Sequence, residues 1–297
     1  MPAAGERALV LGGGGSAGNA WLIGVIAGLF DAALDVTDAD LIVGTSAGST
    51  AAAQITSATP SELLAAILST VAQPRTAPVG SGGGRARSSQ VADHLERTSR
   101  IIAAAEDAAD MRRRMGAAAV QMDEASDASV QSRWRATVAA RLPSPHWPER
   151  TLLITAVDAS TGEPVVFDRH SGVDLVDAVA ASCASGFAYR IGGSRYIDGG
   201  YRSNADNADL AAGYARVLVL SPLGGRSRTP VEWGLHLATQ VDGLRAHGSS
   251  VETIFPDRNS RIAFGDNVMD PSTRPPAARA GSEQARAIAE QLTEFWH

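Results

Sequence analysis

The chain has 297 residues, of which 44% are hydrophobic and 20% charged, an ordinary balance for a globular protein with a sizeable core. All 26 basic residues are arginine and the formal net charge is −6, which argues against a nucleic-acid partner because binding phosphates requires clustered cations. The single cysteine, Cys183, excludes an intrachain disulfide and fits a reducing compartment. The start of the chain lacks the long apolar stretch of a signal peptide, so we expect a cytoplasmic protein.

Apolar residues in the first and last parts of the chain alternate between two patterns. Short apolar runs that stop at glycines or turn residues indicate buried strands, and apolar residues three and four apart indicate helices. The alternation of the two is typical of a mainly parallel sheet with crossover helices, so we predict an α/β three-layer sandwich. The predicted strands are 7–11, 41–43, 152–157, 165–167, 195–197, 216–220 and 251–255, and the predicted helices are 19 to about 34, one ending near 56, 174–181, about 231–246 and 281–296.

The middle of the chain interrupts this pattern. Residues 74–90 are rich in proline and glycine and are predicted to form a loop. Residues 90–141 carry no strand signal and are predicted to form two or three helices. We therefore predict one domain over residues 1–297 with a helical insert at roughly 74–148, which either caps a site or forms an ordinary helical layer.

A G-x-S-x-G sequence follows the second predicted strand directly and precedes a helix. In Gly44-Thr45-Ser46-Ala47-Gly48 the flanking glycines allow strand and helix to pass close together. Such a turn exposes the serine hydroxyl and places it near a helix N-terminus, where N–H groups favour developing negative charge. Ser46 is therefore a candidate nucleophile.

A run of glycines lies between the first strand and the first helix. Successive glycines leave backbone N–H groups open, and at the start of a helix they form an anion-binding nest. Gly13-x-Gly15-x-x-Gly18 also matches the dinucleotide fingerprint, but no acidic residue ends the next strand, because Asp38 and Asp40 precede it. We expect an oxyanion hole rather than a nucleotide site.

A nucleophilic serine requires a base. None of the histidines lies in an obvious loop after a sheet strand, whereas Asp198 ends a short predicted strand and is followed by Gly199 and Gly200. A partly buried carboxylate in direct contact with a serine hydroxyl can accept its proton. The six histidines are His94, His146, His170, His236, His247 and His297.

Together, the glycine run, the G-x-S-x-G turn and the distant Asp-Gly-Gly resemble the patatin-like phospholipase family, over residues 7–57 and about 150–220. The resemblance implies that Ser46 attacks an ester carbonyl, with Asp198 as base and then as acid for the leaving alcohol. It also implies that the amides of Gly13, Gly14 and Gly15 hold the oxyanion, and that no metal or other cofactor takes part. The glycines that complete these motifs are Gly18, Gly44, Gly48, Gly199 and Gly200.

Two positions depart from the family pattern. Family members usually carry Arg or Lys before the last glycine of the first motif, where this chain has Ala17. The family also tends to have a proline after an Ala-Ser pair, and none follows Ala181-Ser182 here. We interpret the neighbouring Cys183 as a packing residue, and expect Asp206 or Asn207 to cap a helix at 208–213.

The sequence thus predicts a carboxylic ester hydrolase that acts on phospholipids or lysophospholipids, with possible transient contact with a membrane surface. The basic segment 111–115 could touch anionic head groups, although a solvated helix face explains it better. One alternative is a small-ester or acylglycerol esterase. Another is a non-catalytic module that binds a nucleotide or a lipid.

Overall fold

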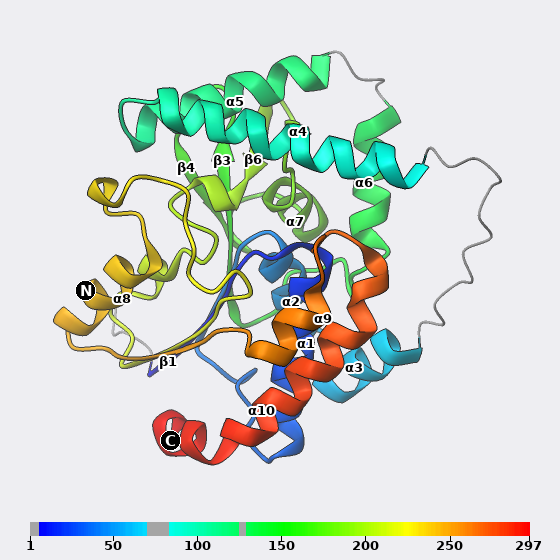
Figure 1. Cartoon of the computed structure of the whole chain (residues 1–297). Coiled ribbons are helices and arrows are strands. Elements are labelled where there is room, and N and C mark those ends of the chain that lie inside the picture. Colours follow the sequence, from blue (N-terminus) through cyan, green and yellow to red (C-terminus); the bar gives the residue numbers. More distant parts are fainter. Residues whose placement is uncertain (1–5, 70–82, 125–128) are drawn as a thin grey trace.

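The computed structural model describes residues 6–69, 83–124 and 129–297, and places an eight-stranded sheet between helices (Figure 1). The strands are β1 (Arg7–Leu11), β2 (Leu41–Gly44), β3 (Thr151–Asp158), β4 (Pro164–Phe167), β5 (Tyr189–Ile191), β6 (Ser194–Asp198), β7 (Arg216–Leu220) and β8 (Ser250–Ile254). The helices are α1 (Gly15–Asp31), α2 (Ala47–Ile55), α3 (Pro60–Ser69), α4 (Gly83–Ala104), α5 (Ala108–Glu124), α6 (Ser129–Ala139), α7 (Leu175–Ser182), α8 (Leu237–Ala246), α9 (Arg258–Phe264) and α10 (Arg274–Trp296).

The strand order β5-β6-β3-β2-β1-β7-β8 is parallel from β3 to β8, whereas β4 and β6 run antiparallel to β3. The predicted α/β class with a mainly parallel sheet is therefore confirmed. Parallel strands end at the same edge, and Leu11 lies opposite Gly44 there. Strand β3 continues past this edge, where Ala156 pairs with Asp198 of β6. The register thus brings the ends of β1, β2 and β6 together.

Side chains on the central strands alternate between two apolar layers. On β1, Leu9 and Leu11 pack among the buried residues of α1, α2, α7 and α10. Ala8 and Val10 point to the other face, where α8 covers them. Both faces of the central strands are buried, which explains why their sequences are continuous apolar runs rather than alternating ones.

Helix α10 lies alongside α1 (Figure 1) at a distance that only glycine permits. A Cβ atom built at Gly24 would collide with the carbonyl of Ala278, and one at Gly28 would collide with that of Ser282. From the other side, a Cβ at Gly281 would meet the carbonyl oxygen of Trp21 at 2.6 Å. The two backbones are therefore in direct contact.

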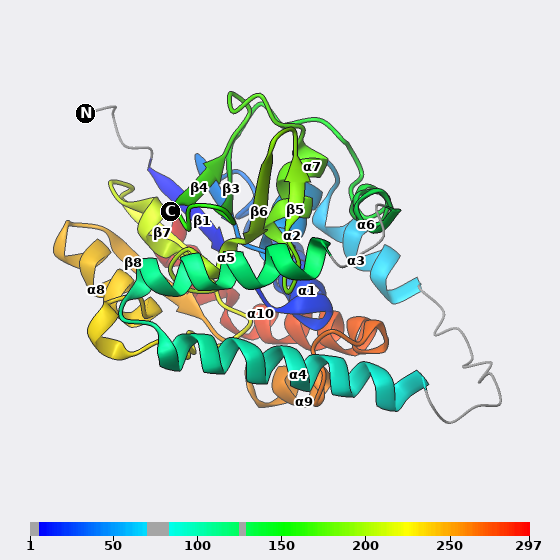
Figure 2. The ribbon, with the colours of Figure 1, turned by 90° about the horizontal axis from the view of Figure 1, so that it is seen from above.

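The insert consists of α4, α5 and α6, which confirms the predicted helices of residues 90–141. Figure 2 shows α4 and α5 running roughly side by side, with α5 next to the strands and α4 on the side away from them. Helix α5 packs at the end of β3, where a Cβ at Gly116 would collide with the carbonyl of Ala159. The loop predicted for 74–90 is wrong for residues 83–90, which begin α4, and its remainder lies outside the described residues.

Several predicted boundaries also need correction. Helix α1 begins at Gly15 rather than at 19, α8 begins at Leu237 after a separate turn of 3₁₀ helix, and α10 begins at Arg274 rather than at 281. Helices α3 and α9 and strand β5 were not predicted from the sequence. None of the helices in the described ranges combines the length and apolar character needed to cross a lipid bilayer.

Candidate active site

Ser46 lies in the tight turn between β2 and α2. Its backbone has φ 52° and ψ −116°, a conformation that non-glycine residues rarely adopt. The flanking glycines explain how the turn fits: a Cβ at Gly48 would collide with the carbonyl of Leu11, and one at Gly44 would lie 2.6 Å from the Cα of Ser49. The predicted strand-turn-helix context of Ser46 is therefore present.

Asp198 ends β6 and faces Ser46 directly. The Ser46 hydroxyl donates a hydrogen bond to Asp198 Oδ2 at 2.8 Å, and the amide of Gly200 donates to Oδ1 at 2.8 Å. Next to it, a Cβ at Gly199 would collide with Thr155 on β3, so only glycine allows the chain to turn here. Two residues far apart in sequence thus form one short hydrogen bond.

Burial makes the Asp198 carboxylate more basic than an ordinary one. Asp198 is only 7% exposed to solvent. Loss of hydration raises its pKa to about 6, although the hydrogen bonds from Gly200 and Ser46 oppose this rise. A carboxylate with a pKa in this range can accept a proton near neutral pH.

No histidine hydrogen-bonds to Ser46 or Asp198 in the described parts of the chain. The imidazole of His94, on α4, lies 3.2 Å from the Ser185 hydroxyl and 3.5 Å from that of Tyr201. His236 contacts the carbonyl of Thr229. The histidines therefore offer no serine–histidine pair in this arrangement.

The glycine run lies beside Ser46, where a Cβ at Gly13 would be 3.5 Å from the Ser46 Cβ. The amide of Gly13, however, donates to the carbonyl of Ala205 at 2.8 Å, so it is bonded within the protein. The amides of Gly14 and Gly15 have no such partner among the described residues. They lie at the start of α1, where unpaired N–H groups favour an anion.

The sequence analysis did not find Ser182, which holds the backbone of the turn. At the end of α7, the Ser182 hydroxyl accepts a hydrogen bond from the amide of Ser46 at 2.9 Å. The neighbouring Cys183 thiol donates to the carbonyl of Ser46 at 3.1 Å. Burial raises the pKa of Cys183 to about 11, so this thiol stays protonated and is a poor nucleophile.

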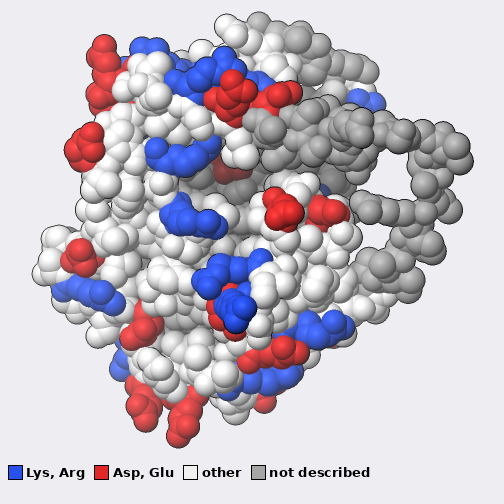
Figure 3. Space-filling view, viewed as in Figure 1, with Lys and Arg blue, Asp and Glu red and all other residues white. Residues whose placement is uncertain are grey.

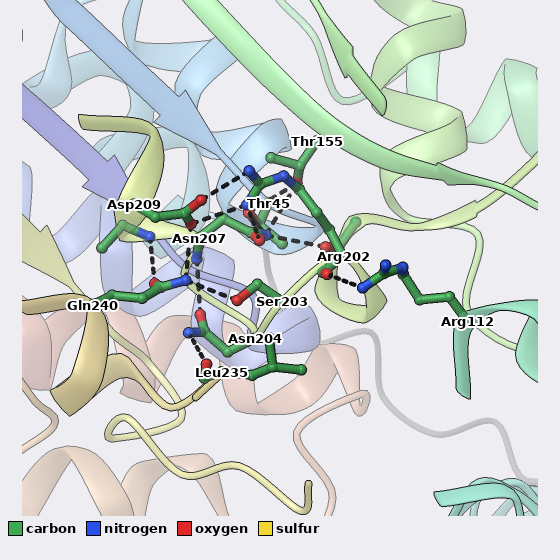
Figure 4. Close-up of polar contacts among 12 residues, drawn as sticks. Thr45, Arg112, Thr155, Arg202, Ser203, Asn204, Asn207, Asp209, Leu235 and Gln240 are labelled. Carbon is green, nitrogen blue, oxygen red and sulfur yellow. Dashed lines mark hydrogen bonds and ion pairs between the residues drawn. The ribbon is translucent and has the colours of Figure 1, made fainter. Parts of the chain in front are cut away.

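A polar network around Asn207 includes Thr45 and Thr155 (Figure 4). The Asn207 amide donates to Thr45 Oγ1 at 3.0 Å and to the carbonyl of Gly199 at 3.0 Å, and the Thr155 hydroxyl donates to Thr45 Oγ1 at 2.9 Å. Thr45 precedes Ser46 and Gly199 follows Asp198, so the network holds the chain next to each of the two candidate residues. Asn207 does lie at the N-cap position, before the 3₁₀ helix Ala208–Ala211, but its side chain forms no capping hydrogen bond and serves this network instead.

No group of three potential metal ligands occurs among the residues that the structure covers. Gly18, which we expected to support the glycine motif, packs closely against Pro222, since a Cβ there would lie 3.0 Å from the proline side chain. The arrangement offers a hydroxyl, a basic carboxylate and two amides that have no hydrogen-bond partner among the described residues, which are the groups that acyl transfer requires.

The sequence model of one family, described as patatin-like phospholipase, matches residues 9–211, which is more than half of the chain. The chain belongs to the patatin-like phospholipase family. Membership supports lipid acyl hydrolase activity in general. The matched range contains the glycine run, Ser46 and Asp198, and it ends before β7.

Among solved structures, VipD from Legionella pneumophila is similar to this chain, with a TM-score of 0.42 and 13% sequence identity. The alignment covers 98% of this chain and 67% of that chain. Among curated protein sequences, none matches the chain.

Ala17, the position that departs from the family pattern, is held by contacts with a neighbouring segment of the chain. The side chain of Ala17 is buried, and its amide donates to the carbonyl of Val268 at 2.9 Å. The backbone of Val268 also lies against Gly15, where a Cβ would approach its carbonyl oxygen to 3.0 Å. The segment after α9 therefore supports the glycine run without a cation at position 17.

Proposed function

We propose that this chain hydrolyses carboxylic esters of phospholipids or lysophospholipids through a seryl-acyl intermediate on Ser46. The observation that carries the proposal is the 2.8 Å hydrogen bond from the strained Ser46 to the buried carboxylate of Asp198. Family membership supports the lipid acyl hydrolase class, and the geometry supports the roles of the two residues.

In the first step, Asp198 Oδ2 accepts the hydroxyl proton while Ser46 Oγ bonds to the ester carbonyl carbon. The carbonyl oxygen becomes an oxyanion near the amides of Gly14 and Gly15, which have no hydrogen-bond partner among the described residues. Because the Gly13 amide is bonded to Ala205, we leave it out of this role. The carbon–oxygen bond to the alcohol then breaks, and Asp198 returns the proton to the leaving alcohol.

In the second step, water replaces the alcohol. Asp198 accepts a proton from the water as its oxygen bonds to the acyl carbon. The bond from that carbon to Ser46 Oγ breaks, and the proton returns to Ser46 while the fatty acid leaves. One carboxylate thus serves as base and acid in turn, which requires a pKa not far from neutral.

The alternatives differ in what they require of this site. A small-ester or acylglycerol esterase would use the same two residues on another substrate. A nucleotide-binding module would require an acidic residue at the end of β2, but this strand ends at Gly44 and leads into Ser46. A non-catalytic lipid-binding module would not require the basic carboxylate against Ser46.

A fluorophosphonate probe tests the nucleophile. We expect the wild-type protein and a Ser132→Ala control, which alters an exposed serine on α6, to be labelled, and Ser46→Ala to remain unlabelled. Labelling that persists in Ser46→Ala, or an unlabelled wild type, would rule out the proposed mechanism.

The Asp198→Asn variant tests the base. It should fold normally and lose on the order of 10²–10⁴-fold in kcat on p-nitrophenyl butyrate.

A further inference from the structure

The peptide between Gly199 and Gly200 carries the hydrogen bond that holds one side of the Asp198 carboxylate. Its N–H end, the amide of Gly200, donates to Asp198 Oδ1 at 2.8 Å, while Oδ2 accepts from the Ser46 hydroxyl. Its C=O end, on Gly199, accepts from the side-chain amide of Asn207 at 3.0 Å. Because a trans peptide is planar, with its N–H and C=O pointing in opposite directions, a hold on the carbonyl also sets the direction of the N–H.

The side-chain amide of Asn207 is held in one orientation by its partners. Its two N–H bonds go to Thr45 Oγ1 and to the Gly199 carbonyl, both at 3.0 Å. Its oxygen accepts from Arg202 at 3.1 Å. A guanidinium can only donate and a backbone carbonyl can only accept, so the reversed amide would mispair at both ends. Asn207 and Thr45 are 0% exposed, and a lost partner would leave a buried polar group unpaired.

Arg202 directs an N–H group at Asn207 because Asp209 clamps its guanidinium. Nη1 donates to Asp209 Oδ1 at 2.9 Å and Nη2 donates to Oδ2 at 2.8 Å, a paired contact that fixes the plane of the guanidinium. The same Nη1 donates to Asn207 (Figure 4). The Gln240 side chain donates to Asp209 Oδ1 at 2.8 Å and accepts from the Ala208 amide at 2.9 Å. The clamp on Arg202 is thus held in place by a further residue.

The ion pair of Arg202 with Asp209 differs from ion pairs on the surface. Acidic and basic side chains are interspersed over the described part of the face in Figure 3, where water weakens their attraction. Only 14% of the Arg202 side chain is exposed, against 41% for Asp209. The guanidinium of Arg112, on α5, donates to the Arg202 carbonyl at 3.1 Å. Both the backbone and the side chain of Arg202 are therefore fixed, which suits this residue to orienting a neighbour.

We propose that Arg202 is a positioning residue for the proposed hydrolysis. Through the amide of Asn207 it orients the Gly199–Gly200 peptide, and this peptide in turn points the Asp198 carboxylate at Ser46. Within the described chain, the Arg202 guanidinium hydrogen-bonds to Asn207 and Asp209 and to neither of the two candidate catalytic residues. The inference rests on the proposed function, because it concerns how the base of that mechanism is held.

A misaligned peptide should change the pKa of Asp198 in a known direction. The hydrogen bond from Gly200 lowers this pKa and so opposes the rise that burial causes. A weaker bond therefore leaves the pKa higher. Since Asp198 must be ionised to accept a proton, the rise of kcat/KM with pH should move to higher pH when Arg202 is replaced.

Other ionisable groups near Asp198 must be separated from this effect. Cys183 on one side and Tyr201 on the other stay neutral near neutral pH, because burial raises their pKa values to about 11 and about 12. His94, on α4, lies 3.5 Å from the Tyr201 hydroxyl, and burial lowers its pKa. Each comparison is therefore repeated in the His94→Gln protein. The positive charges near His94 are Arg97 and Arg228.

Replacing Arg202 by glutamine tests the inference. In Arg202→Gln we expect kcat on p-nitrophenyl butyrate to fall on the order of tenfold, with a smaller change in KM. The midpoint of the pH profile should move up by about 0.5–1 pH unit. The matched control is Arg7→Gln, which breaks a partly buried pair with Asp38 at the opposite edge of the sheet. This control should keep both kcat and the midpoint.

A double substitution tests whether Arg202 acts through Asn207. Asn207→Gly deletes the amide, and glycine readily adopts the left-handed backbone of this position, where φ is 56°. In that background Arg202→Gln should cause little further change in kcat or in the midpoint, since the connecting side chain is already absent. An equally large change in both backgrounds overturns the inference, and so does a folded Arg202→Gln protein with unchanged kcat and midpoint.

Asp209→Asn is the variant to use if thermal melts show that Arg202→Gln does not fold. It releases the clamp at a partly exposed acid and should cause a smaller shift in the same direction. An unchanged kcat and midpoint in this variant overturn the inference as well.

Carbon-13 NMR of the Asp198 carboxyl measures the same pKa without turnover, its resonance being assigned by its absence from Asp198→Asn. The titration should move to higher pH in Arg202→Gln, or in Asp209→Asn where the former does not fold, and an unmoved titration rejects the role of Arg202. A wild-type protein that hydrolyses no ester rejects the proposed function, while the NMR titration still decides whether Arg202 positions Asp198.

Discussion

At the scale of single residues, burial gives Asp198 the basicity that a proton acceptor needs. The pKa of an ordinary aspartate lies well below neutral pH, so its carboxylate is a weak base at neutral pH. Here the loss of hydration raises the pKa of Asp198 to about 6, and the hydrogen bond from Ser46 keeps the serine proton in line with it. The same carboxylate is therefore basic enough to take a proton and acidic enough to return it.

The dependence of activity on pH follows from this pKa. Asp198 must be ionised to accept the Ser46 proton, so kcat/KM for p-nitrophenyl butyrate should rise as the pH passes through about 6 and level off above it. Because a histidine titrates in a similar range, His94→Gln serves as the control and should retain the rise. A profile that stays flat from pH 5 to 7.5 would show that Asp198 is not the base.

Ser182 makes a second residue-scale prediction. Its hydroxyl is the acceptor for the Ser46 amide, so Ser182→Ala leaves that amide without its partner and loosens the turn. We expect kcat to fall by about tenfold or more with a smaller change in KM, and unfolding to become easier by about 1–3 kcal/mol. Ser182→Thr, which restores a hydroxyl, should recover part of the activity. A Ser182→Ala protein with unchanged kcat would mean that the turn keeps its shape without this bond.

At the scale of elements, the contact between β1 and α2 sets the position of Ser46. Gly48→Ala would place a methyl group against the carbonyl of Leu11, so the turn must open or the helix must shift. We expect a loss of about 1–3 kcal/mol in the free energy of unfolding, measured by denaturant melts, together with a large loss of activity.

Gly243→Ala is the control for this substitution. Gly243 lies inside α8 with open space where its Cβ would be, so alanine should be neutral or stabilising by up to about 1 kcal/mol. Equal stability of Gly48→Ala and the wild type would mean that the close contact is not a constraint.

The sequence predicted the strands better than the helix boundaries. A buried strand such as β7 is a short apolar run, and that pattern survives whatever packs on it. Helix α10 was expected at 281 but begins at Arg274, with Pro275 and Pro276 in its first turn. Proline is tolerated in the first turn of a helix, where its missing N–H would have no partner. Likewise, the glycines at the start of α1 and α4 read as loops although both helices begin there.

The candidate site was predictable only in part for a similar reason. Ser46 and its glycines form a local pattern, so the sequence displays them together. Ser182 and Asn207 reach the site from separate elements through single side chains, and nothing adjacent to them in the sequence indicates this. The bonded state of the Gly13 amide likewise depends on Ala205, which no spacing rule connects to the glycine run.

At the scale of the whole molecule, buried carboxyl groups make stability depend on pH. Asp206 is 1% exposed, and burial raises its pKa to about 7, opposed by a hydrogen bond from Ser221. Its carboxyl lies against Gly12, behind the glycine run. A folded-state pKa above the unfolded value means that folding favours the protonated form. Stability is therefore lost as the pH rises from about 4 through about 7.

Asp206→Asn removes this ionisation at similar volume. We expect the variant to exceed the wild type in free energy of unfolding by roughly 1–3 kcal/mol at pH 8, and to match it near pH 4, where Asp206 is protonated in the folded state. Denaturant melts at the two pH values measure the difference. Asp266→Asn, at an exposed acid, should show none. A variant that gains nothing at pH 8 would mean that Asp206 is hydrated when ionised.

The contact between α1 and α10 also governs the order in which the molecule can assemble. The first helix packs along the last one, backbone to backbone, so no folding route can complete the core around α1 before the chain closes nearly its whole length. During synthesis on the ribosome, the apolar surface of α1 stays uncovered until residues 274–296 have emerged. We therefore expect a nascent chain to stay inactive and prone to aggregate until its last helix has docked.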